Sequence, residues 1–449
     1  MRQKFVYLIL LLCISGFLNA QKLLMMREAI ELARQQNLAV RQALTESAAA
    51  KQQVRQFLSV GLPQINASGN YSYNIQPQQF VLPGEFFGQP GIFQRVDASP
   101  PFQVSLGINA SLNLIDGSYI YGLKATRLYS DIMDAQKHRT EMMVIRQVKE
   151  NYLRAAFLKE NLKILQENIT DSRRIAFETE QIVKQGFREN VDAQVVRFAS
   201  DTLELTYRRL EAALEATLLN LKILLKLSPE EKIDVKESLE DLFDTLNPKR
   251  AINENTGITS LEAPEISILK LNVKASEINE KVEFSKAFPR LSTYFNWGYA
   301  GFNSNKNNPV LFSSGSTYFA SGTTWGFSLI FPIFSSFKRQ ATFKRARLQT
   351  ETARLQQENT VRTLDAQLRI IKIQLKLALE SLQQAEENLK IQEYIREINR
   401  KKFKEGLISS FDLLQTDTQF RTSRFAILKN KMDALMLLTA YDYLINKSE

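Results

Sequence analysis

Cysteine and histidine are almost absent from this chain of 449 residues. Its single cysteine is Cys13, and its single histidine is His138, in a polar stretch at residues 136–139. An intrachain disulfide needs two cysteines, and a zinc site or a cysteine–histidine dyad needs several of these side chains together. The composition therefore excludes a disulfide framework, a His/Cys metal cluster and cysteine–histidine catalysis.

Sequence motifs of common enzymes are missing too. The chain contains no G-x-S-x-G nucleophile elbow, no phosphate-binding P-loop and no H-E-x-x-H zinc helix. We expect His138 on a solvated helix surface rather than in a catalytic site. The expected protein is therefore not an enzyme, and it holds no cofactor and no metal.

The chain carries an excess of positive charge. Residues 1–20 hold Arg2 and Lys4, so 56 basic residues remain beyond them against 48 acidic ones, a net charge of +8. The basic residues are spread along long stretches and do not gather with aromatic residues in one patch. This distribution is typical of solvated helix faces and predicts no nucleic-acid partner.

Residues 1–20 have the pattern of a signal peptide. Arg2 and Lys4 give a basic start, residues 5–17 form an apolar run, and Ala20 is a small residue before a cut at Gln21. The apolar run is shorter than the about 20 residues of a membrane-spanning helix. We therefore expect the mature chain to be exported.

The mature chain is built from one unit used twice. The pattern Lys-x-Gly-x5-Asp occurs at residues 184–192 and again, 220 residues later, at 404–412. Each copy is far longer than the about 20 to 50 residues of a solenoid repeat, so we expect a duplicated, domain-sized unit. The predicted organisation is a first repeat at 21–227 (helix 26–58, strands 65–75 and 102–114, helices 117–185 and 190–227), a connector or equatorial segment at 228–263, and a second repeat at 264–449 (helix 264–287, strands 291–300 and 323–333, helices 338–404 and 409–446).

The four predicted strands have features of membrane strands. In 65–75 every odd position is apolar or small and every even one is Asn or Ser, and 102–114 alternates in the same way. No Lys, Arg, Asp or Glu interrupts these two segments. A length near 10 residues, an uncharged polar face and aromatic residues toward the strand ends favour a membrane barrel over a sheet that covers a soluble core.

The alternation predicts which residues face lipid and which face the lumen. The residues predicted to face lipid are Tyr71, Tyr73, Leu106, Ile108, Trp297, Trp325 and Phe327. The residues predicted to line the lumen are Asn66, Ser68, Asn70, Ser105, Asn109 and Ser111. Lipid forbids open sheet edges and known barrels begin at about 8 strands, so four strands per chain predict an oligomer.

Long helices are predicted between the strand pairs. Residues 117–185 contain no proline, and apolar residues in 145–169 and 361–389 recur at spacings of three and four. This is the a/d pattern of a coiled coil. A continuous helix of about 65 residues would extend on the order of 100 Å, so it needs partner helices along its length.

The two Lys-x-Gly-x5-Asp patterns mark the turns between long helices. A glycine after a helix supplies the left-handed residue that reverses the chain, and an aspartate early in the next helix meets the positive end of its dipole. Gly186 and Gly406 fit the first role, and Asp192 and Asp412 fit the second. Capping alone explains all four residues, and it remains the alternative to any functional role.

The order of these features resembles the TolC-like outer membrane efflux protein family (outer membrane factors). The likeness covers essentially the whole mature chain, and the stretches 27–33 and 112–118 are similar to that family's first helix and its strand-to-helix exit. The resemblance implies an α+β membrane protein, a homotrimer in which four strands per chain form a 12-stranded barrel continued by a long helical coiled-coil tunnel in the periplasm. It also implies docking on a periplasmic adaptor protein and an inner-membrane pump, which select the substrate.

The resemblance also implies roles for residues at the turns. It places the adaptor-contact tips at Gly186, Phe187, Gly406 and Leu407, and the periplasmic aperture at Asp192, Asp412 and Gln415. The chain departs from the best-known member at Phe403 and Ile408, where that protein has a tyrosine and an arginine that help to close its entrance, and at Gln415, where it has a further aspartate. Arg188 or Lys404 are candidates to replace the missing polar lock.

The predicted function is a passive channel of the cell outer membrane for a tripartite efflux or type I secretion system. Two alternatives remain: a periplasmic adaptor and a secreted coiled-coil scaffold. An adaptor does not need charge-free alternating strands in duplicate. A scaffold would fold its strands into a soluble sheet, and it would not need detergent for extraction.

Overall fold

The computed structural model describes residues 22–186, 189–253, 262–303 and 317–447. The predicted signal peptide at 1–20, the predicted contact residue Phe187 and Arg188 lie outside the described residues. The chain divides into two compact units. Unit 1 comprises residues 1–47, 132–270 and 355–449, and unit 2 comprises residues 48–131 and 271–354.

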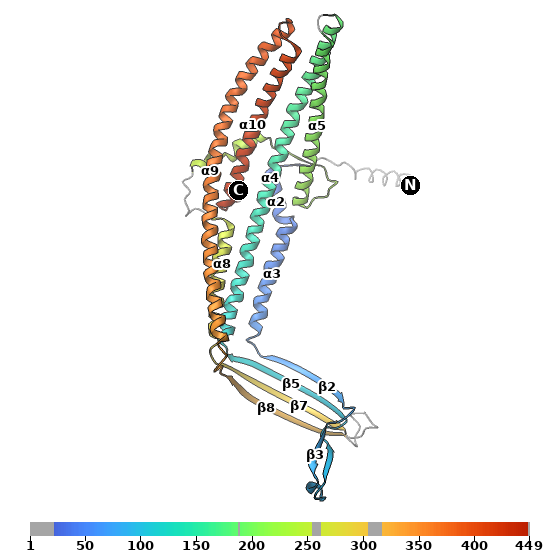
Figure 1. The fold of residues 1–449 in the computed structure, drawn as a ribbon, viewed down its shortest axis with the longest axis vertical. Coiled ribbons are helices and arrows are strands. Elements are labelled where there is room, and N and C mark those ends of the chain that lie inside the picture. Colours follow the sequence, from blue (N-terminus) through green and yellow to red (C-terminus); the bar gives the residue numbers. More distant parts are fainter. Residues whose placement is uncertain (1–21, 187–188, 254–261, 304–316, 448–449) are drawn as a thin grey trace, which may run out of the picture. The chain divides into compact units, whose positions relative to one another are not determined.

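Unit 2 contains one antiparallel sheet of four strands (Figure 1). Its strands are β2 (Gln64–Tyr73), β5 (Phe102–Ile115), β7 (Arg290–Asn303) and β8 (Thr317–Ile330), in the order β2-β5-β7-β8. Both strand pairs of the duplicated sequence therefore join in a single sheet, with β5 against β7 at its centre. β8 begins and ends earlier than the predicted 323–333, because its paired register with β7 extends back to Thr317, opposite Asn303.

The connection between the first two strands has regular structure of its own. Residues 76–101 are rich in proline and glycine, but they contain β3 (Gln79–Pro83), a short 3-10 helix η1 (Gly84–Phe87) and β4 (Phe93–Asp97). β3 and β4 pair antiparallel, from Gln79 opposite Asp97 to Pro83 opposite Phe93. The turn residues of this segment thus close a hairpin and do not form an irregular loop.

The predicted helix at 26–58 is two helices, α2 (Met26–Gln36) and α3 (Leu38–Ser59). Asn37 separates them, and its side-chain oxygen accepts hydrogen bonds from the backbone N–H of Ala39 at 2.9 Å and of Val40 at 3.3 Å. An asparagine in this position caps the start of a new helix. The single-helix prediction was wrong because the apolar pattern continues across a capping residue.

Two helical hairpins form most of unit 1, and the parts of their helices at residues 117–131 and 338–354 belong to unit 2. The first joins α4 (Gly117–Lys184) to α5 (Asn190–Leu225), and the second joins α9 (Lys338–Lys404) to α10 (Ser410–Leu444) (Figure 1). The a/d positions of the sequence supply the buried contacts: Val148, Tyr152 and Ala155 on α4 are fully buried, as is Leu375 on α9. The long helices therefore pack through the stripe that their periodicity predicts.

The connector forms a second layer on α4 and α10. It contains β6 (Ile233–Val235), which pairs in parallel with β1 (Lys22–Leu24), then α6 (Leu239–Leu246) and α7 (Lys249–Asn253), and α8 (Pro264–Ser285) follows. The buried Tyr152 hydroxyl on α4 donates to the Leu24 carbonyl at 2.8 Å. On α10, Asp442 accepts two hydrogen bonds from Arg250 of α7, at 2.8 and 3.0 Å.

Within the described part of the chain, the helices carry too many polar residues for any of them to span a membrane.

Candidate functional site

The strand register gives the sheet two chemically different faces. Residues directly opposite each other in a ladder point to the same face of the sheet. Ile108 on β5 lies opposite Ala67 on β2 and Trp297 on β7, whereas its neighbour Asn109 lies opposite Asn66 and Asn296. One face is therefore apolar and aromatic over all four strands, and the other carries Asn, Ser, Thr and Gly over most of its length.

The register places the thirteen predicted barrel residues in two groups. On the apolar face lie Tyr71, Tyr73, Leu106, Ile108, Trp297, Trp325 and Phe327, and on the polar face lie Asn66, Ser68, Asn70, Ser105, Asn109 and Ser111. In one chain the apolar face is open, with Trp325 67% and Phe327 58% exposed. A contiguous exposed apolar surface of this kind marks contact with lipid or another chain.

The sheet ends in two open edges. β2 and β8 are its outer strands, and in the described part of the chain each pairs with one neighbour only. Their free backbone N–H and C=O groups need water or another strand as partner. In a hydrocarbon environment only a closed sheet satisfies them.

The turns of the two helical hairpins both use glycine in the left-handed region. Gly186 follows α4 with φ of 79°, and Gly406 follows α9 with φ of 74°. Both lie in open space, so the requirement for glycine comes from the backbone angle and not from crowding. The adjacent Leu407 is 67% exposed.

Asp412 is part of a helix cap. Its carboxylate accepts hydrogen bonds from the Ser409 hydroxyl at 2.7 Å and the Ser409 backbone N–H at 3.1 Å, while the Ser409 hydroxyl accepts from the Asp412 N–H. This reciprocal arrangement is a capping box at the start of α10. The hydrogen bonds from Ser409 hold the pKa of Asp412 below its usual range.

Asp192 has a different local setting. It lies in the first turn of α5, whose N-cap residue, Glu189, makes no side-chain capping hydrogen bond. Gln415 is exposed one turn after Asp412 on α10. The structure therefore brings Asp412 and Gln415 onto one helix end, and it gives the sequence-equivalent aspartate of the first hairpin no matching capping box.

Phe403 and Ile408 belong to an apolar cluster near the turns. Phe403 is buried with Ile175 of α4, Val196 of α5, and Leu413 and Leu414 of α10, and Ile408 packs against the same group. The residues that replace a polar lock in the sequence thus join all four long helices by apolar contact. The candidate substitute Lys404 is exposed.

A group of buried and half-buried charges connects the two hairpins. Arg396 of α9 binds Asp417 of α10 at 2.7 Å and Asp171 of α4 at 2.8 Å, and Arg400 binds Asp171 at 2.7 Å. We call these four residues the cross-hairpin ion cluster. Burial acts to raise the pKa of Asp171, but the hydrogen bond and charge of Arg400, with the charge of Arg396, lower it.

The cross-hairpin ion cluster was not predicted from the sequence. Asp171 and Arg396 are 225 residues apart, and neither stands in a distinctive motif. The Arg396 guanidinium also lies over the Phe420 ring, 4.3 Å from its centroid, which fixes its orientation. The sequence did carry one weak signal. Asp171 and Arg396 stand next to apolar stripes of their helices, and a charged side chain that is buried there needs an oppositely charged partner.

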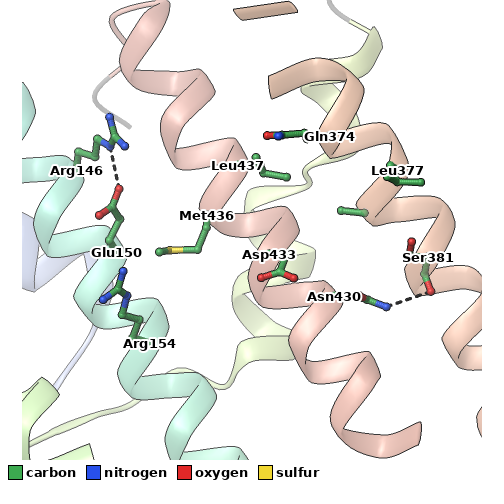
Figure 2. A pocket seen from close by; sticks show the side chains of 11 residues that line it. Arg146, Glu150, Arg154, Gln374, Leu377, Ser381, Asn430, Asp433, Met436 and Leu437 are labelled. Carbon is green, nitrogen blue, oxygen red and sulfur yellow. Dashed lines mark hydrogen bonds and ion pairs between the residues drawn. The ribbon is translucent and has the colours of Figure 1, made fainter. Parts of the chain in front are cut away.

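A groove of about 640 Å³ lies between α4, α9 and α10, with a lining of polar and apolar residues (Figure 2). From α4 it is lined by Arg146, Glu150 and Arg154, and Arg146 binds Glu150 at 2.8 Å. Asp433 faces it from α10, and Ser381 and Gln374 line it from α9. The groove occupies a different face of α4 from Tyr152 and Lys159, which contact the connector.

Among the described residues, no group of three or more His, Cys, Asp or Glu side chains is placed to hold a metal ion. The ionisable clusters instead pair acids with bases.

A family model identifies the family of this chain. The family model for outer membrane efflux proteins matches residues 29–225 and 259–438. No curated protein sequence matches the chain.

Solved structures with this fold cover most of the chain. The Vibrio cholerae outer membrane protein VceC is 13% identical with a TM-score of 0.73, over 94% of this chain and 95% of VceC. The Campylobacter jejuni outer membrane channel CmeC is 17% identical with a TM-score of 0.72, over 94% and 86% of the two chains. The open state of the Neisseria gonorrhoeae outer membrane channel MtrE is 15% identical with a TM-score of 0.70, over 94% and 89%.

Proposed function

Because this chain belongs to the outer membrane efflux protein family, we propose that it is the outer-membrane duct of a tripartite efflux or type I secretion system. As a member of this family it is a passive channel of the cell outer membrane and not an enzyme. The energy for export then comes from an inner-membrane pump. A periplasmic adaptor protein links that pump to the duct.

The two-faced sheet is the observation that carries the proposal. Its apolar face suits contact with lipid, and its uncharged polar face suits a water-filled lumen. Three chains would pair the open edge of β2 in one copy with the open edge of β8 in the next, giving a closed barrel of 12 strands without free edges. The open edges support an oligomer, and a homotrimer is the assembly that we propose.

Exposed apolar residues on the helices support the same trimer. The outer helices of the hairpins carry large side chains that are more than half exposed in one chain: Val191, Phe198 and Leu205 on α5, and Ile373, Ile391 and Tyr394 on α9. Such stripes become buried when helices of neighbouring copies pack together.

The cross-hairpin ion cluster is proposed to hold the tunnel entrance closed. It ties α4 of the first hairpin to α9 and α10 of the second, a few turns before Gly186 and Gly406. Moving one hairpin away from the other would separate Asp171 from both arginines and leave charges without partners, which is costly in a half-buried site. The apolar cluster around Phe403 adds a contact that docking must also break.

The hairpin turns are the proposed docking surface for the adaptor. Leu407 is exposed beside Gly406, and exposed Phe411 lies in the first turn of α10. An exposed apolar pair at a turn suits an apolar contact with a partner protein.

Charge substitutions on the two faces of β5 test the duct. We expect Leu106→Arg, on the apolar face, to destabilise the inserted trimer by about 2 to 4 kcal/mol, and Asn109→Arg, on the polar face, to have a mild effect. The measurement is the denaturant midpoint of the protein in vesicles. Equal damage at both positions would contradict the assignment of faces.

Extraction separates the duct from its two alternatives. A duct requires detergent for release from membranes and runs as a heat-sensitive trimer on a gel. A periplasmic adaptor or a secreted scaffold would appear in the soluble fraction without detergent.

A further inference from the structure

A second cavity, of about 590 Å³, lies between α2, α4 and α6 in unit 1, on residues different from those that line the groove. We call it the α2–α6 cavity. Most of its lining comes from α2 and α6, and Lys149 on α4 and Glu237, just before α6, complete it. Small-molecule sites have volumes of about 300 to 1,000 Å³, so this cavity can admit a small ligand.

Part of the lining is apolar. Met26 and Ile30 stand one turn apart on α2 and are 5% and 9% exposed, and Leu242 and Leu246 stand one turn apart on α6, where Leu242 is 2% exposed. Residues four apart lie on the same face of a helix, so each helix turns two apolar side chains toward the cavity. Together they offer a surface on which an apolar chain can be buried.

Two arginines of the lining have hydrogen-bond donors to spare. Arg34 forms ion pairs with Glu31 at 3.5 Å and with Glu141 at 3.4 Å, but its side chain donates no hydrogen bond to any residue that the structure describes. Arg27 is exposed, and within the described residues it has neither a hydrogen bond nor an ion pair. A guanidinium presents paired N–H groups that match the two oxygens of a carboxylate.

A buried lysine adds a third positive charge. Lys149 lines the cavity from α4 and is only 5% exposed. Attraction between opposite charges is stronger where little water separates them. An anion that enters the cavity therefore meets a strong positive field near Lys149.

The two acidic residues of the lining leave part of this charge unbalanced. The Glu237 carboxylate accepts hydrogen bonds from the Met26 N–H at 2.6 Å and from the Tyr152 hydroxyl at 3.0 Å, so it caps the start of α2. The Glu31 side chain is 59% exposed, and water screens its ion pair with Arg34. With three basic residues against two acidic ones, the lining has a net charge of +1.

We propose that the α2–α6 cavity binds a small carboxylate amphiphile, which has one anionic head and a short apolar chain. Arg34 and Lys149 bind the carboxylate, and the chain lies along the apolar residues of α2 and α6. One negative charge balances the net charge of the lining, whereas a phosphate monoester, with a charge of about −1.5 to −2, would exceed it. All lining residues belong to one chain and to unit 1, so binding does not require the trimer.

Fluorescence quenching by a brominated ligand tests the site. The full-length protein in detergent carries a Thr245→Trp reporter in the cavity lining, with Trp297→Phe and Trp325→Phe so that no other tryptophan emits. The probes are bromohexanoate, which has a carboxylate, and bromohexanol, which has the same chain without the charge. We expect bromohexanoate to quench the reporter at a concentration at least fivefold lower than bromohexanol does.

A second reporter controls for general attraction of anions to a basic surface. Gln349→Trp, in the same background, is exposed beside Arg345 and Arg347 on α9. We expect this reporter to respond to the two probes within about twofold of each other. The same preference for bromohexanoate at both reporters would overturn the site, because it would need no cavity.

Two charge variants should shift the affinity in opposite directions. Arg34→Gln removes a partner of the carboxylate, so we expect bromohexanoate to bind at least fivefold more weakly. Glu31→Gln removes a competing acid beside Arg34, so we expect severalfold tighter binding. Arg41→Gln removes an exposed charge on α3 outside the lining and should bind like the parent protein.

Glu31→Gln keeps the test decisive if Arg34→Gln does not fold, because a loss of structure does not strengthen binding. Equal quenching of the Thr245→Trp reporter by both probes would show an apolar cavity without anion recognition and would overturn the proposal. Unchanged affinity in Glu31→Gln would overturn it as well. The duct is tested separately by the substitutions on β5, so either result leaves it standing.

Discussion

The turn after α4 and the turn after α9 both reverse on a glycine, with φ of 79° at Gly186 and 74° at Gly406. Beyond the glycine the two hairpins differ. The second hairpin starts its return helix with the Ser409–Asp412 capping box, whereas the N-cap of α5, Glu189, makes no side-chain capping hydrogen bond. The two aspartates that match in sequence therefore have different local roles.

The two copies of the duplicated unit contribute different residues to the turns and to the contacts between the hairpins. The second hairpin supplies a well-capped turn and also both arginines of the cross-hairpin ion cluster, while the first supplies the Asp171 carboxylate that they bind. The two repeats share the elements of the fold, because each supplies two strands of the four-stranded sheet and one helical hairpin. The contacts proposed to close the tunnel come from residues that the repeats do not share.

The largest effect is expected at the exposed tip of the second hairpin. We expect Leu407→Asp to abolish export, because docking would bury a charge in an apolar contact, while the trimer remains intact. Export is measured as resistance to a pumped compound, and assembly as the heat-sensitive band on a gel. Gln349→Asp, at an exposed position of α9 away from the turn, is the control. Normal export by Leu407→Asp would mean that the turn only caps the helices and does not contact the adaptor.

Removing the arginine shared by both hairpins should open the closed channel. A close charge pair contributes about 1.5 kcal/mol or more, and 1.36 kcal/mol is a factor of ten, so Arg396→Ala should raise the open-to-closed ratio about tenfold. Single-channel recording in planar bilayers measures that ratio. Arg362→Ala removes an exposed ion pair with Glu358 on the same helix and should change little. Equal ratios in both variants would mean that the cluster only stabilises the fold.

Acid should loosen the same cluster. The pKa of Asp171 lies below its ordinary value near 4, so its pairing with Arg396 and Arg400 is fully present above about pH 4 and is lost as the pH falls through the lowered pKa. We expect no change in the open fraction between pH 7 and 5 and a severalfold rise below about pH 4. The rise is moderate because Asp171 is partly exposed and therefore screened. An Asp171→Asn variant should be more open at neutral pH and should lack this rise, and an unchanged acid response in that variant would exclude the cluster as its cause.

The smallest effect is expected from the two aspartates near the turns. In a trimer, copies of Asp412 and Asp192 near one axis would favour cations, so Asp412→Asn should weaken cation preference and relieve block by multivalent cations with little change in trimer stability. Asp192→Asn is the matching variant in the first hairpin. Because α5 starts without a capping box, this variant removes the charge without removing a capping box. Unaltered selectivity in the double variant would leave both residues as structural groups only.

The larger features of the fold could be predicted from the amino-acid sequence. The family and the fold class predicted from the duplicated strands, long helices and turns are confirmed by the family match and by the similar solved structures. Helix α9 has the predicted bounds of 338–404, whereas the hairpin β3–β4, the break at Asn37 and the β1–β6 pair were not predicted. Each of these depends on a single polar residue, a turn or a partner far away in the sequence.

The amino-acid sequence alone determined the features that repeat locally. A period of two gives a strand its two faces, a spacing of three and four gives a helix its buried stripe, and a glycine after a helix permits a left-handed turn, so each is legible in a short window. Only the tertiary structure decided which charges of the two hairpins meet and that Ser336 and Phe337, after β8, lie at positive φ. The ion pairs join groups that lie some 200 residues apart in the sequence, and the positive φ angles are imposed by neighbouring elements. Neither feature produces a repeating pattern in the amino-acid sequence.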